Sequence, residues 1–197
     1  MKSLTITLLL AFLIFEGCNK TNSSTPIMID FDGNQYRTIR IGTQIWTIEN
    51  LHVKHTPEGK TVVSHPPKED TLTINVYGLL YDWNTARLVI PRGWHLPSDE
   101  EWIALEKNLN GIVLKDSIFE SHQSKMQGRE FCIRPAGYWN DAGFDNRFGN
   151  TAVFWTSTAK DSHFVWSRVL TANSDSLRKA AQHPQYGFSV RCVKDNK

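Results

Sequence analysis

Oxygen-bearing side chains gather in one stretch of the sequence, Trp139-Asn140-Asp141, with Asp145 a few residues further on. Amide and carboxylate oxygens are the ligands that Ca²⁺ takes in proteins. Asn and Asp also favour turns, because their side chains bind the nearby backbone. We weigh a calcium site against the start of a loop and favour the loop, so we expect no metal.

The same stretch carries chemistry suited to a carbohydrate, because aromatic rings offer a large apolar face and polar groups can bind hydroxyls. Trp139 lies at a loop edge and is the indole that we expect to be exposed. The candidate ligand-binding residues are Trp139, Asn140, Asp141, Asp145, Arg147 and Arg168. The other tryptophans fall in expected strands or on a core face, and are Trp46, Trp83, Trp94, Trp102, Trp155 and Trp166.

Enzyme and cofactor motifs are missing from the sequence. It contains no G-x-S-x-G, H-E-x-x-H, phosphate-binding loop or dinucleotide fingerprint. His52 and His55 are close enough in sequence to share a zinc ion, but no further ligand motif completes the shell, and two solvated loop histidines are favoured. We expect neither catalytic residues nor cofactors.

The first 17 residues have the pattern of a secretion signal. Lys2 supplies a positive charge, and residues 4–15 form an apolar run that is too short for a permanent membrane anchor. Cys18 follows Gly17 directly, as in bacterial lipoproteins, whose thiol is acylated with chains such as palmitate. The alternative is ordinary signal-peptidase cleavage, or no cleavage, with Cys18 incidental; we favour lipidation. Residues 18–26 then form a lipidated tether, and residues 27–197 form the domain.

Two further cysteines, Cys132 and Cys192, form an even pair if Cys18 is lipidated. A disulfide between them suits an oxidising compartment, and two buried free thiols remain an equal alternative. The chain has 197 residues and a net charge of +2, with no basic block. These values fit one domain behind a leader and give no support to a nucleic-acid partner.

Periodicity and turn residues indicate an α+β domain. Turn signals at residues 32–34 and 42–44 predict a β-hairpin, and Ser98 with Glu101 predicts a capping box for a helix that ends at Gly111. Expected strands lie at residues 72–76, 131–138, 152–156, 164–170 and 188–193, while residues 77–86 fit a strand end or a short helix. Residues 139–151 and 174–185 are expected loops. In the last strand, Phe188, Val190 and Cys192 are expected on one face.

The sequence resembles the Fibrobacter succinogenes major paralogous domain in a series of strings that occur in family order. They are DGNQYRTIRIGTQIWTIENL (32–51), YGLLYDWNTA (77–86), PRGWHLPSDEEW (91–102), RPAGYW (134–139), FWTST (154–158), WSR (166–168) and GFSVRCVKD (187–195). The resemblance implies a C-type-lectin-like α+β fold in secreted proteins and surface lipoproteins. The family has no established molecular function, so the resemblance implies no catalytic residues.

The sequence departs from the patterns that the resemblance implies. The family often has a cysteine just before the P-x-G-W-H-L-P string, where Ile90 stands here, so Cys192 lacks that expected partner. Either Cys132 pairs with Cys192 or both stay reduced. The W-N-D string of sugar-binding C-type lectins is accompanied upstream by E-P-N or Q-P-D, and neither string occurs here.

The sequence therefore predicts a non-catalytic binding module that is exported through the inner membrane and lipid-anchored at the outer membrane or cell surface. Its expected ligand is a polysaccharide or a cell-surface protein, bound by the loops at residues 139–151 and 174–185. One alternative is an enzyme related to formylglycine-generating enzymes, which need a pair of reactive thiols near the C-terminus, where Cys192 is alone. The other is a structural subunit of a surface assembly.

Overall fold

The computed structural model of the protein describes residues 27–68, 71–109, 131, 133–141, 143–144, 147–174 and 176–195. Its elements are β1 (Ile27–Ile29), β2 (Gln35–Ile41), β3 (Gln44–Thr47), a 3-10 turn (Thr71–Thr73), α1 (Ile74–Tyr77), α2 (Trp83–Leu88), β4 (Trp94–His95), α3 (Asp99–Asn108), β5 (Trp139–Asn140), β6 (Gly143–Phe144), β7 (Thr151–Ala159), β8 (Val165–Thr171), β9 (Arg178–Gln182) and β10 (Val193–Lys194). Antiparallel strands and short helices confirm the α+β class. No helix in these ranges is long and apolar enough to span a membrane.

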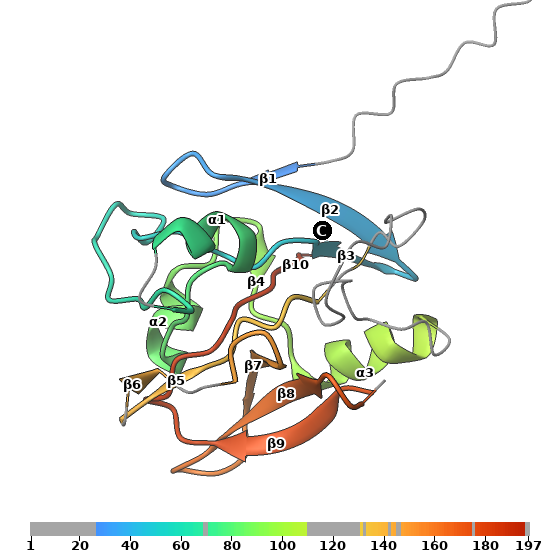
Figure 1. The fold of residues 1–197 in the computed structure, drawn as a ribbon. Coiled ribbons are helices and arrows are strands. Elements are labelled where there is room, and N and C mark those ends of the chain that lie inside the picture. Colours follow the sequence, from blue (N-terminus) through green and yellow to red (C-terminus); the bar gives the residue numbers. More distant parts are fainter. Residues whose placement is uncertain are drawn as a thin grey trace, which may run out of the picture.

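One sheet joins the two ends of the described chain. Its strand order is β1-β2-β3-β10-β4, so the last strand lies between β3 and β4 (Figure 1). The predicted hairpin is confirmed, with Ile41 paired to Gln44 across the turn. Gly42 has a φ of 59°, which glycine adopts without strain, and a Cβ there would come within 2.7 Å of Asn108 at the end of α3.

A second sheet has the order β7-β8-β9 and contains the strands predicted at residues 152–156 and 164–170. The loop predicted at residues 174–185 is wrong in part, because β9 lies within it. β9 is an edge strand with the sequence RKAAQ, and every one of its residues is at least partly exposed. The β9 sequence has no alternating apolar face, so its pattern does not predict a strand.

The predicted helix is α3, and its capping box is confirmed. Ser98 Oγ accepts a hydrogen bond from the Glu101 N–H at 3.2 Å, and Glu101 Oε2 accepts one from the Ser98 N–H at 2.8 Å. The helix ends at Asn108 with Leu109 as its C-cap; the predicted terminal Gly111 lies outside the described residues.

Three predicted strands differ from the structure. The strand predicted at residues 72–76 is wrong, since a 3-10 turn and α1 lie there. Residues 133–138 form no regular strand, because Pro135 has no N–H to donate and Gly137 has a φ of 68°. Residues 188–192 make isolated bridges to Tyr81 and Phe154 instead of a continuous ladder.

The segment at residues 188–193 is buried on both faces. Ser189 and Arg191 are buried along with Phe188, Val190 and Cys192. Figure 1 shows this segment crossing the middle of the molecule between β1–β3 and β7–β9. A run buried on both faces cannot show the period of two that a half-exposed strand shows.

The core contains most of the predicted aromatic residues. Trp102 of α3 packs on Trp46 and Phe154, with ring centroids at 4.8 and 5.3 Å. The core tryptophans Trp46, Trp102 and Trp155 are fully buried, as predicted. The remaining three, Trp83, Trp94 and Trp166, are half-buried.

Trp102→Ala should lower the free energy of unfolding by about 3–5 kcal/mol, because a fully buried indole leaves a cavity among aromatic rings. Trp102→Phe should cost less, since a ring remains and the indole N–H, which has no acceptor within the described residues, is removed. Urea denaturation of both variants tests this. Equal losses would show that ring packing does not determine the cost.

Candidate functional site

A pocket of about 170 Å³ lies where the two predicted ligand loops meet, against β7, β8 and the last segment. Its floor is apolar. Val153 of β7 and Val169 of β8 are antiparallel partners, and buried Phe188 completes the floor beside them. An apolar base of this kind suits the body of an organic ligand.

Two tyrosines form the walls of this pocket. Tyr138 is nearly perpendicular to Phe188, at 89° with ring centroids 6.1 Å apart. Tyr186 meets the same ring at 68° and 6.3 Å. Both tyrosine rings therefore pair edge-on with Phe188, and all three aromatic side chains line the pocket.

The rim is polar and comes from two separate segments. One segment supplies Asn140 of β5 and Arg147, and β9 supplies Arg178 and Gln182. Residues 178 and 182 share a strand face because side chains repeat every second residue. The amides and guanidinium groups offer planar hydrogen-bonding surfaces around an apolar floor.

Trp139 lies outside the pocket, although it is flanked by two pocket residues. It follows Tyr138 and precedes Asn140, so strand alternation directs it to the other side. It was expected to be exposed; the structure places it half-buried and stacked on His65, with rings 4.1 Å apart at 4°. Burial lowers the pKa of His65, against an opposing effect of Asp82.

The other predicted ligand residues divide into three groups. Asn140 and Arg147 line the pocket. Asp141 is exposed and lies outside the lining, and Asp145 lies outside the described residues. Arg168 is only 4% exposed and faces the interior, so its guanidinium is not a surface group.

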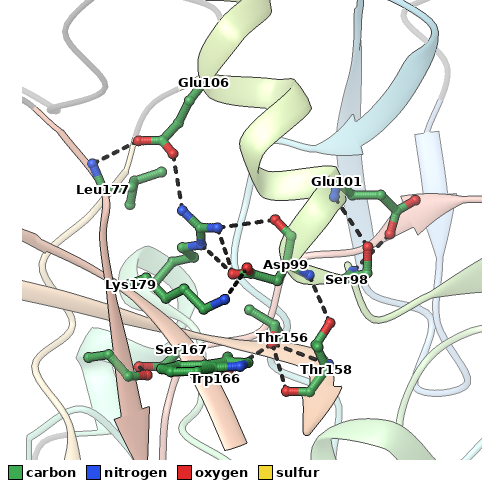
Figure 2. A network of polar contacts seen from close by, with 12 residues as sticks. Ser98, Asp99, Glu101, Glu106, Thr156, Thr158, Trp166, Ser167, Leu177 and Lys179 are labelled. Atoms are coloured by element: carbon green, nitrogen blue, oxygen red, sulfur yellow. Dashed lines mark hydrogen bonds and ion pairs between the residues drawn. The ribbon is translucent and has the colours of Figure 1, made fainter. Parts of the chain in front are cut away.

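Arg168 belongs to a polar network that fastens α3 to β8 and β9, in which Arg168 and Asp99 are buried. Figure 2 shows its members Asp99, Glu106 and Lys179. Arg168 Nη2 donates to Asp99 Oδ1 at 2.6 Å, and Arg168 Nη1 donates to Glu106 at 3.2 Å. Lys179 binds the other Asp99 oxygen at 2.6 Å and lies over the Trp166 ring at 4.1 Å. This network positions the strands that carry the pocket.

Of the three cysteines, the structure describes only Cys192. Cys192 is fully buried, and burial raises the pKa of its thiol. Cys18 and Cys132 lie outside the described residues, so lipidation and the disulfide remain predictions. Within the ranges that the structure covers, no three His, Cys, Asp or Glu side chains gather as a metal site.

Sequence reasoning found the two segments but missed most of the pocket. The missed residues are Tyr138, Thr151, Val153, Val169, Arg178, Gln182, Tyr186 and Phe188. The signal that could have found some of them is alternation. Once residues 138–140 are treated as extended, Tyr138 and Asn140 share a face and Trp139 does not.

The fold and pocket define an α+β domain with a small ligand-sized recess. The chain belongs to the Fibrobacter succinogenes major domain family, whose sequence model matches residues 39–194. The match runs from β2 to β10 and includes every pocket residue, which confirms the family resemblance. No curated protein and no solved structure matches the chain.

Asp99→Asn should lower the free energy of unfolding by about 3–5 kcal/mol, because it leaves the buried Arg168 guanidinium without its main counter-charge. Chemical denaturation measures the loss. Glu100→Gln is the matched control: it removes a carboxylate from the same first turn at an exposed position, and should cost about 0.3–1 kcal/mol. Equal losses would assign the effect to the helix dipole.

Proposed function

We propose that this protein is a non-catalytic surface module that binds a polysaccharide in the pocket between β5 and β9. The observation that carries the proposal is the pocket's composition. Tyr138 and Tyr186 stand beside an apolar floor, while Asn140 and Gln182 present amide groups at the rim. A sugar ring has apolar C–H faces and a girdle of hydroxyls, so it fits rings below and amides around it.

The proposed architecture is C-type-lectin-like, as the family resemblance implies. Its support is that the first and last described strands, β1 and β10, belong to one sheet, while β7, β8 and β9 form a second. In this arrangement the two ends of the described chain, β1 and β10, belong to one sheet (Figure 1). The candidate ligand site includes residues of all three strands of the other sheet. An experimental structure with another strand order would contradict it.

The alternative of a thiol-dependent enzyme finds less support. A reactive cysteine needs access to solvent and a lowered pKa. Cys192 is fully buried, and its surroundings raise the pKa of the thiol. We therefore favour a binding role over redox chemistry at this residue.

Immobilised polysaccharides provide the test of the binding site. The wild type should bind at least one polymer, and Tyr186→Ala should weaken that binding by about tenfold, because it removes a wall of the pocket. Phe164→Ala is the control, since Phe164 is an exposed aromatic residue away from the pocket lining. No binding by the wild type, or an equal loss in the control, would refute this site.

The proposed anchor is a lipid on Cys18, with the short polar tether leading to β1 at Ile27. Cys18→Ser should move the protein from the membrane fraction to the soluble fraction of a bacterial host and abolish labelling by a palmitate analogue. Cys132→Ser should keep both membrane association and label. Retention of label in Cys18→Ser would show that the site is elsewhere.

A further inference from the structure

We propose that the pocket selects an acidic sugar residue, whose carboxylate is bound by Arg178 together with Arg147; this rests on the proposed polysaccharide binding. Among the described residues, the pocket lining contains both arginines and no aspartate or glutamate. A guanidinium group donates hydrogen bonds and accepts none, and its planar fork matches a carboxylate. The charged part of the rim is therefore built to receive an anion.

Strand alternation separates Arg178 from the structural cation beside it. Lys179 faces α3 and binds Asp99, whereas Arg178 faces the pocket. Cross-strand partners lie on the same face of the sheet. Arg168 pairs with Lys179 on the α3 face, and Val169 pairs with Arg178 on the pocket face. The two adjacent cations of β9 thus serve opposite faces of the sheet, and only one of them contributes to the fastening of α3.

The guanidinium of Arg178 keeps its donors available. Within the described part of the chain, it makes no hydrogen bond, ion pair or ring contact. The buried arginines are engaged: Arg168 binds Asp99, and Arg191 binds Asn50. An arginine that is partnerless on a pocket rim can meet a ligand carboxylate without first losing an internal contact.

Arg147 belongs to the other segment of the rim and is held by its own turn and by an aromatic ring. Its carbonyl accepts hydrogen bonds from the N–H groups of Asn150 and Thr151, at 3.0 and 2.9 Å. Its guanidinium carbon lies 5.5 Å from the centre of the Tyr138 ring, a cation–π distance. A ligand carboxylate at the rim would therefore meet positive charge from both segments.

The size of the pocket limits what the arginines can bind. Its volume of about 170 Å³ is below the roughly 300–1,000 Å³ of sites for drug-sized ligands. It suits one sugar ring on the apolar floor, with the hydroxyls meeting Asn140 and Gln182. We therefore infer a single uronic acid residue of a longer polymer as the occupant.

The test compares polygalacturonate with the same polymer after its carboxyl groups have been reduced to alcohols. The full chain should bind the acidic polymer at least about tenfold more tightly, and added salt should weaken that binding. Arg178→Gln should remove most of the preference by weakening acidic-polymer binding about tenfold, while leaving the exposed, unpaired position structurally undisturbed.

Arg40→Gln is the matched control. Arg40 is an exposed arginine of β2 that lines a different and larger groove, so the substitution removes the same charge away from the pocket. It should keep acidic-polymer binding within about twofold. An equal loss of affinity for the acidic polymer in Arg178→Gln and Arg40→Gln would show that only the net charge of the protein matters, and would overturn the proposal.

The outcomes separate this inference from the proposed function. Binding of both polymers with equal affinity, lost in Tyr186→Ala, would overturn the acidic preference and leave polysaccharide binding intact. If the protein binds neither polymer but binds a neutral polysaccharide, the acidic preference is likewise overturned and polysaccharide binding stands. Failure to bind any polysaccharide would overturn both proposals.

Discussion

Asp99 is a carboxylate buried in the first turn of α3, and it binds two cations from two neighbouring strands. Arg168 of β8 and Lys179 of β9 take one oxygen each, and Thr158 Oγ1 accepts a hydrogen bond from the Asp99 N–H at 3.0 Å. A buried carboxylate is costly unless it is fully paired, so helix and strands must be in place together. This one group fixes the position of the second sheet against the helix.

The second sheet therefore has two faces with different tasks. On the α3 side lie Phe154, Arg168 and Lys179, which are cross-strand neighbours of β7, β8 and β9. On the other side, Val153 and Val169 with Arg178 line the pocket. Because side chains alternate along each strand, fastening one face to the helix leaves the adjacent residues free to present a ligand site.

The sequence predicts the helix and the hairpin of the scaffold better than it predicts the residues of the pocket. Ser98 and Glu101 predicted α3 because a capping box is a local pattern, and a turn at Gly42 predicted the hairpin in the same way. Arg168 is a candidate ligand residue by its sequence, whereas the structure buries it against Asp99, which is 69 residues away, and no local pattern indicates that contact. Trp139 was misjudged because its exposure depends on His65, which approaches from another loop.

The pocket shows why such sites resist prediction from one sequence. Its rim comes from an edge strand without apolar alternation and from Asn140 and Arg147, which lie in a two-residue strand and in a turn, where local signals are weakest. The lack of an apolar pattern also suits binding, because the rim residues are not needed to pack the hydrophobic core. Arg178 illustrates this: its neighbour Lys179 meets the structural demand for a cation on β9, so the charge of Arg178 is left for whatever enters the pocket.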